Sequence, residues 1–146
     1  MKRMLGVLML VLVSVATACE KPTPEQQLAK LKARAAAGNA AAQDSLGTMY
    51  DNGTGVPQDN TEAVKWFRLA AAQGDAEAQS NLGVMYYFGE GVPEDYVQAY
   101  KWYNLAAAAG DTRAVKNKNR VAEKMTKEQI VEAQRLSTAF TPTKTP

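Results

Sequence analysis

The sequence has no histidine and a single cysteine among its 146 residues. Without histidine the chain cannot build the Ser-His or Cys-His pairs of many hydrolases, and one cysteine forms neither an intramolecular disulfide nor a Cys/His zinc site. Phosphate-binding glycine loops and metal-ligand constellations are missing as well. We therefore predict one ordinary domain that is not an enzyme and has no catalytic residues, no cofactor and no metal.

A concentration of positive charge is also missing. The formal charge of +2 comes from two basic residues within positions 1–18, and the rest of the chain is neutral, with 15 basic and 15 acidic residues. The aromatic-rich residues 39–110 carry a charge of −6, whereas residues 111–146 carry +4. Because nucleic-acid-binding surfaces combine basic and aromatic side chains, this separation excludes nucleic acid as a partner.

The first 18 residues have the composition of an export signal. Two basic residues precede an apolar run from Leu5 to Val13, and small residues follow it up to Ala18. This order is typical of a cleavable signal peptide. The apolar run is well short of the ~20 residues that a membrane-spanning helix needs. We therefore predict that residues 1–18 are a signal peptide and that the protein is exported.

The signal ends directly before Cys19, which leaves two processing routes open. Ala16-Thr17-Ala18 fits ordinary secretory cleavage, whereas Thr17-Ala18-Cys19 resembles the end of a bacterial lipobox, in which the cysteine is joined to diacylglycerol. Ala16 departs from the leucine that the lipobox prefers. A lone thiol at the new N-terminus of an exported protein favours lipidation. We expect Cys19 to be the lipid-attachment residue, followed by a short linker that completes residues 19–24.

Lipidation would attach the protein to a membrane without crossing it. Glu20 stands where an aspartate would, by resemblance to enteric lipoproteins, signal retention in the inner membrane. The expected location is therefore the bacterial cell envelope, as an outer-membrane lipoprotein that faces the periplasm. The alternative is a soluble protein of the periplasm or the medium.

An internal repeat with a period of 36 residues fills the middle of the chain. Residues 38–57 align with residues 74–93 through Ala-Gln, Leu-Gly, Met-Tyr and Gly-x-Gly-Val-Pro, and the match continues to a shared Leu-Ala-Ala-Ala. Agreement of this kind does not arise from composition. We define repeat 1 as residues 38–73 and repeat 2 as residues 74–109.

Each repeat predicts two helices joined by a glycine-rich turn. Apolar residues recur at helical spacing in both halves, and Asn39, Asp59, Asp75 and Asp95 stand at N-cap positions. A glycine inside a helix costs about 1 kcal/mol relative to alanine, so glycine within the first helix predicts close helix packing. The predicted structural positions are Leu46, Gly47, Tyr50, Gly53, Gly55 and Trp66 in repeat 1, and Leu82, Gly83, Tyr86, Gly89, Gly91 and Trp102 in repeat 2.

The repeated pattern resembles the Sel1-like repeat, a relative of the tetratricopeptide repeat. The resemblance implies an all-α fold, a short α-solenoid of antiparallel helix pairs with about seven helices. Residues 25–37 resemble the second helix of a preceding half-repeat, and residues 110–138 resemble a degenerate third unit with a C-terminal capping helix. We expect residues 139–146 to be a flexible tail.

The resemblance also places the first helix of each unit on a concave surface. Positions off the buried stripe are then candidates for contact with a partner, and Tyr87 is the candidate hot spot because tyrosine combines a rigid apolar body with a polar tip. The alternative is that Tyr87 and Phe88 only cover the next helix pair. The candidates are Asp44, Thr48, Asp51, Ser80, Asn81, Val84, Tyr87 and Phe88, with Arg113, Lys116 and Asn117 at a basic end.

The function implied by the resemblance is that of an adaptor or scaffold. We expect a non-catalytic protein-protein interaction module of the cell envelope that binds a peptide or protein segment on its concave face. One alternative is an inhibitor or immunity lipoprotein directed against an envelope toxin or enzyme. A less favoured alternative is a cell-wall hydrolase that uses Glu90 or Glu94, which we expect in an exposed turn without a desolvated pocket.

Overall fold

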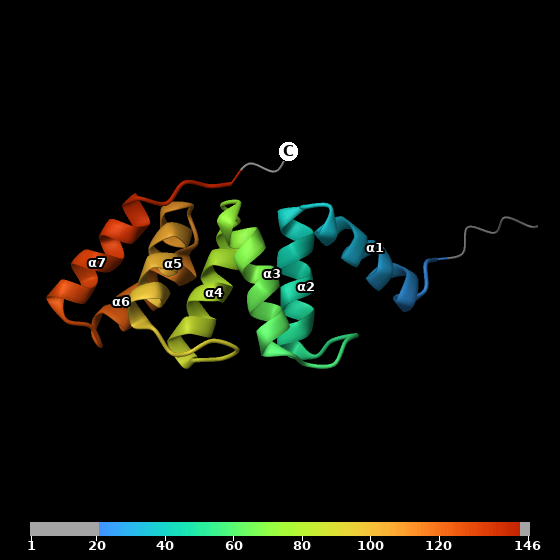
Figure 1. Cartoon of the computed structure of the whole chain (residues 1–146), viewed down its shortest axis with the longest axis horizontal. Helices are drawn as coiled ribbons and strands as arrows, with labels where there is room; N and C mark the ends of the chain where they lie inside the picture. The colour runs from blue at the N-terminus through green and yellow to red at the C-terminus, as the bar shows by residue number, and fades with distance from the viewer. Residues whose placement is uncertain (1–20, 144–146) are drawn as a thin grey trace, which may run out of the picture.

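The computed structural model describes residues 21–143, and these contain seven α-helices and no strand. The helices follow one another in a row (Figure 1), and each packs against the next from α1 to α6, while α7 packs against α5. This arrangement confirms the predicted short α-solenoid. The helices are α1 (Pro24–Ala36), α2 (Ala40–Asn52), α3 (Asn60–Ala72), α4 (Ala76–Phe88), α5 (Tyr96–Ala108), α6 (Thr112–Ala122) and α7 (Lys127–Thr138).

The helices begin at the predicted caps. Asn39 and Asp75 each accept a hydrogen bond of 2.9 Å from the backbone N–H three residues later. Asp59 and Asp95 do the same at 3.0 Å. These bonds satisfy amide groups that have no partner within the helix, and they fix where each helix starts. The first helices end at their glycine C-caps, Gly53 and Gly89.

Two glycines bring the helices of each pair into close contact. A Cβ atom at Gly47 of α2 would lie 2.7 Å from ring carbons of Phe67 in α3, and a Cβ at Gly83 of α4 would lie 2.7 Å from a ring carbon of Tyr103 in α5. Only glycine leaves room for an aromatic ring on the helix backbone. The close packing predicted at these two glycines is therefore present in both repeats.

The two repeat tryptophans are not equally covered. Trp102 of α5 is 8% exposed and belongs to the apolar cluster with Phe67, Leu82 and Met85. Trp66 of α3 is only half-buried. Trp66 packs against the smaller apolar cluster of Ala35, Ala42 and Leu46, so both tryptophans lie at core clusters and Trp66 is the less covered of the two.

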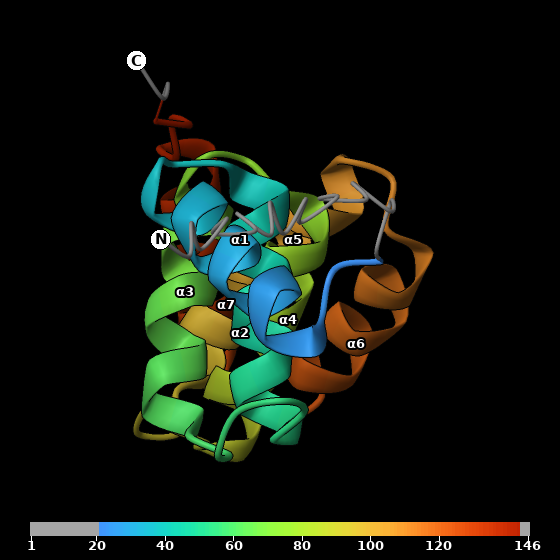
Figure 2. The same ribbon diagram turned by 90° about the vertical axis from the view of Figure 1, so that its right-hand side faces the viewer.

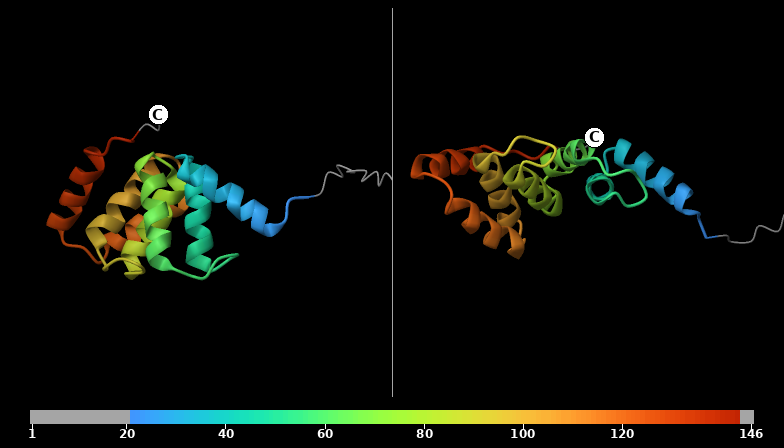
Figure 3. Two further views of the ribbon diagram at one scale, coloured as in Figure 1. Left: turned by 45° about the vertical axis from the view of Figure 1, so that its right-hand side comes forward. Right: turned by 90° about the horizontal axis from the view of Figure 1, so that it is seen from below.

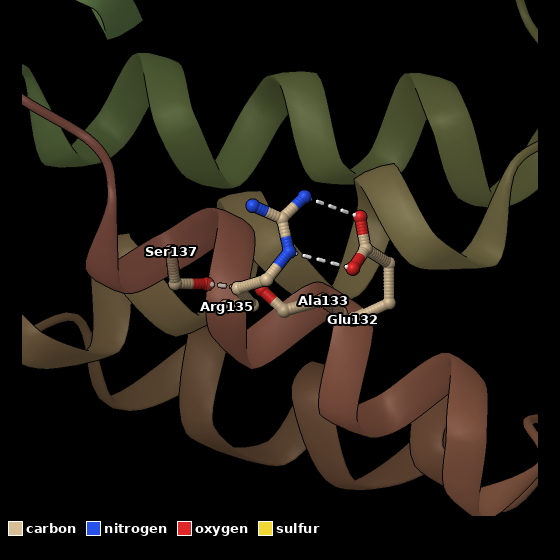
Figure 4. A network of polar contacts seen from close by, with 4 residues as sticks. All are labelled: Glu132, Ala133, Arg135 and Ser137. Atoms are coloured by element: carbon tan, nitrogen blue, oxygen red, sulfur yellow. Dashed lines mark hydrogen bonds and ion pairs between the residues drawn. The ribbon is translucent and has the colours of Figure 1, made fainter.

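The last helices close the array. Buried Ala114 and Val121 of α6 join the apolar cluster of α5. Thr126 and Gln129 form a reciprocal capping box at the start of α7. Along α7, Arg135 forms an ion pair of 2.7 Å with Glu132, while the Ser137 hydroxyl donates to the Ala133 carbonyl (Figure 4).

The C-terminal segment departs from the predicted flexible tail over residues 139–143. The Phe140 ring contacts Trp102 at a centroid distance of 5.7 Å, and the Thr143 N–H donates to the Ala72 carbonyl at 2.7 Å. The segment leaves α7 and runs across the row toward α3 (Figure 1). The Phe140 ring packs on Trp102 of α5, a contact between distant residues that the local sequence pattern does not predict.

Candidate interaction surface on the first helices

The candidate surface lies on α2, α4 and α6, the first helices of the three units. In Figure 2, which looks onto α1 from the end of the row, α3 and α6 lie on opposite sides of the molecule. The eight predicted contact positions divide into a polar set on α2 and α4, whose members are buried or half-buried, and an apolar set at the end of α4. The two sets have different roles.

Asp44 of α2 and Asn81 of α4 form a polar link between the two repeats. The Asn81 Nδ2 donates to the Asp44 carboxylate at 3.0 Å, and Asp44 is only 8% exposed. Burial raises the pKa of Asp44 to about 6, partly offset by the Asn81 hydrogen bond and reinforced by the charges of Asp75 and Glu77.

Ser80 occupies the position of Asp44 one repeat later and is also buried. It contacts Asp111, the N-cap of α6. Burial raises the pKa of Asp111, but hydrogen bonds from the Ala114 and Arg113 N–H groups and from Ser80 outweigh it and hold the pKa below its usual value. Asp44 and Ser80 thus serve the packing between units, which corrects their prediction as partner contacts.

Thr48 and Asp51 continue the α2 surface and are half-buried. Burial raises the pKa of the Asp51 carboxyl. Both residues lie in the C-terminal half of α2 and are the repeat counterparts of Val84 and Tyr87 in α4. They contribute an acidic and polar border to the surface.

Val84, Tyr87 and Phe88 lie together at a pocket of about 180 Å³ between α4 and α6. The Tyr87 and Phe88 rings meet edge to face with centroids 4.8 Å apart. The other lining residues are Tyr103, Asn117, Arg120 and Val121. An apolar floor beside an arginine suits the anchoring of an apolar side chain next to a negative charge.

Basic side chains border this pocket. Helix α6 carries four basic residues and no acidic one in the sequence TRAVKNKNRVA. A second recess of about 440 Å³ is lined by Thr112, Arg113, Lys116 and Asn117. Beyond α6, the Lys124 ammonium lies 5.6 Å from the Tyr87 ring centroid and 5.7 Å from that of Tyr96. The surface therefore pairs an aromatic pocket with a positive rim.

Sequence reasoning missed four of these residues, namely Tyr103, Arg120, Val121 and Lys124. Arg120 and Lys124 follow Lys116 at intervals of four, so helical spacing alone could have placed them on one side. Tyr103 and Val121 are apolar positions of other helices. Only the packing of α4 against α5 and α6 brings them to the pocket.

The residues that could support chemistry are dispersed. Within residues 21–143, no group of three or more His, Cys, Asp or Glu side chains is placed to hold a metal ion. Glu90 and Glu94 are exposed in the turn after α4. Among the helices of this described part, none combines the length and the apolar character that crossing a membrane demands. Cys19 and the predicted signal peptide lie outside the described residues.

Comparisons with known proteins agree with this architecture. The model of the Sel1 repeat matches residues 40–75 and 76–111. The fold is similar to that of a protective antigen of uropathogenic Escherichia coli with an SLR fold, at 35% identity and a TM-score of 0.77 over 83% of this chain. It is also similar to a Sel1 repeat protein from Oxalobacter formigenes, at 41% identity and a TM-score of 0.64 over 64% of this chain.

This chain spans only about a quarter of each of these larger structures, 26% and 27% of their lengths. A comparison with curated proteins gave no significant match. The comparisons therefore establish the repeat and its fold and do not identify a partner.

Proposed function

The chain carries two Sel1 repeats and so belongs to the Sel1-repeat proteins, and on this basis we propose that it is a non-catalytic adaptor that binds a protein segment on α4 and α6. Sel1-repeat proteins are generally protein-interaction modules, and repeat arrays offer extended surfaces for such binding. The observation that carries the proposal is the aromatic pocket of Val84, Tyr87 and Phe88 beside a basic helix.

The chemistry of the surface defines the segment that it would bind. An apolar side chain would fill the pocket, and acidic residues next to it would face Arg113, Lys116 and Arg120. Interfaces gain most of their affinity from a few buried anchors, while the charged rim chiefly raises the association rate and the specificity. The partner is thus an acidic segment with an apolar anchor.

Crosslinking affinity purification from intact cells tests the proposal. The full-length protein is compared with a Tyr87→Ala, Phe88→Ala variant, and Val131→Ala on α7 is the matched control because Val131 is also an exposed apolar side chain. We expect partners that are lost only from the double variant while its helicity is unchanged. An identical list, or no partner in any sample, would contradict the proposal.

We also place this adaptor in the bacterial cell envelope, attached through a lipid on Cys19. The support is the order of basic, apolar and small residues up to Cys19. A Cys19→Ser variant should lose acylation and move from the membrane fraction to the soluble fraction, and globomycin should block processing of the unaltered chain. Normal processing in the presence of globomycin would support the soluble secreted form.

A further inference from the structure

The C-terminal segment fills a groove between α3 and α5. Phe140 packs against Trp102, Pro142 lies against Gly74, and Thr143 bonds to the Ala72 carbonyl at the end of α3. With this segment in place, Trp102 is buried and Leu105 is half-buried. The groove thus holds an extended stretch of chain by one aromatic ring, one proline and one backbone hydrogen bond.

The 36-residue repeat places an equivalent groove between α1 and α3. Ala36 and Trp66 are the counterparts of Ala72 and Trp102, and both line an open cavity of about 590 Å³. Leu69, the counterpart of Leu105, is 50% exposed. In this unit the counterpart of the tryptophan that the tail covers is only half-buried, and the leucine is exposed.

We propose that the groove between α1 and α3 is a second docking site, which takes an extended partner segment with an aromatic residue followed two positions later by proline. The segment would lie as residues 140–143 lie in the neighbouring groove. Its aromatic ring would pack on Trp66, and one of its N–H groups would donate to the Ala36 carbonyl.

The charges around the cavity favour a segment of low net charge. Lys32 lies on the α1 wall, while Asp59 and Glu62 lie at the start of α3. Asp59 is engaged as the cap of α3, and Glu62 pairs with Lys65 at 2.7 Å. The C-terminal segment of this chain already occupies the groove between α3 and α5. We therefore assign the groove between α1 and α3 to a segment of a different protein. This site lies apart from the α4–α6 surface and does not depend on the adaptor proposal.

A synthetic peptide of residues 138–146, labelled with a fluorophore, is the probe. Its sequence, TAFTPTKTP, contains residues 140–143, which contact the equivalent groove. Fluorescence anisotropy with the processed full-length protein should show saturable binding. In a Trp102→Phe background, the emission of the remaining Trp66 should shift to shorter wavelength as the peptide ring covers it.

Two variants and two controls locate the binding. Ala36→Arg alters the α1 wall of the groove, and Leu69→Asp alters the exposed surface of α3 one turn beyond Trp66. Each should weaken peptide binding about tenfold or more, as should alanine in place of the peptide's phenylalanine. Val131→Asp, at an apolar side chain that is 64% exposed on α7, should leave binding unchanged. The Tyr87→Ala, Phe88→Ala variant should also bind the peptide normally, which separates this site from the adaptor surface.

Three results would overturn the inference. The first is no binding of the peptide, and the second is binding that Leu69→Asp and Ala36→Arg leave intact. The third is a concentration-dependent dimer that disappears when residues 139–146 are removed, because the occupant would then be the tail of a second copy of this chain.

Discussion

The Asp44 carboxylate accepts a hydrogen bond from Asn81 across the junction of the two repeats, and it is close enough to the N-cap Asp75 for the two negative charges to interact. One repeat later, Ser80 meets Asp111 at the same positions and donates a hydrogen bond to it. Repeat 2 thus places a donor next to the N-cap carboxylate where repeat 1 places a second carboxylate. The junction at Asp44 is the less favourable of the two.

This difference predicts a dependence of stability on pH. The pKa of Asp44 is about 6 in the folded protein against 3.8 for an unperturbed aspartate, so the folded state holds the proton more tightly. Its contribution to stability is full below about pH 4 and is lost as the pH rises through 6. This difference in the pKa of Asp44 would correspond to ~3 kcal/mol of stability without solvent screening, and screening by solvent reduces our expectation to ~1 kcal/mol.

Asp44→Asn should therefore raise the free energy of unfolding by ~1 kcal/mol at pH 7 and change it little at pH 4. The asparagine still offers an oxygen to Asn81 but removes the charge. Urea unfolding at several pH values measures the effect, and Glu90→Gln in the exposed turn is the charge-matched control. A gain of equal size at pH 4 and pH 7 would refute the ionisation argument. Asp44→Ser should also be tolerated, since repeat 2 uses serine there.

The close contact of α2 and α3 predicts that Gly47→Ala destabilises the protein. Alanine is the better helix former by about 1 kcal/mol. However, its methyl group would lie 2.7 Å from the Phe67 ring, and overpacking of a core costs about 1–3 kcal/mol. After the helix gain is subtracted, we expect a net loss of up to ~2 kcal/mol by chemical denaturation. Adding Phe67→Leu should make the alanine less harmful in a double-mutant cycle, and additive effects would argue against the ring contact.

The docking of the tail predicts that Phe140→Ala lowers stability modestly. The variant loses an edge-to-face contact with Trp102, of the kind worth about 0.5–1.5 kcal/mol beyond the apolar area. Trp102 should become more exposed, so the fluorescence should shift to longer wavelength in a Trp66→Phe background. Val131→Ala on the exposed side of α7 is the control. Unchanged emission would mean that the tail does not cover Trp102 in solution.

The sequence predicted the features that depend on neighbouring residues. Helical spacing, N-caps and the turn motif each act within a few positions, so repeating them every 36 residues defines the helix pairs. The link from Asp44 to Asn81 spans 37 residues, and the contact of Phe140 with Trp102 spans 38. Such contacts depend on how the helix pairs stack. The sequence therefore predicted Tyr87 and Phe88 on one surface but did not predict that Asp44 is buried.

The position of α1 also depends on how the helix pairs stack. As a result, glycines at equivalent positions of the two repeats have different surroundings. The turn of repeat 2 lies against the start of α3, where a Cβ at Gly91 would collide with the Asn60 backbone. The turn of repeat 1 faces a cavity of about 400 Å³ beside the start of α1, which diverges from the row (Figure 3). There a Cβ at Gly55 would meet only the flexible end of Met49, at 3.1 Å.

Alanine at these two glycines should therefore have different costs. Both have φ near +70°, 73° for Gly55 and 68° for Gly91, so each alanine incurs the left-handed penalty of about 1–2 kcal/mol. Gly91→Ala must also displace backbone of α3, which adds ~1–3 kcal/mol. Urea unfolding measures the loss of stability in each variant. Both alanines incur the same left-handed penalty, so the difference between the two losses reports the cost of displacing the α3 backbone. Equal losses would show that in solution α1 packs on the first turn as tightly as α3 packs on the second.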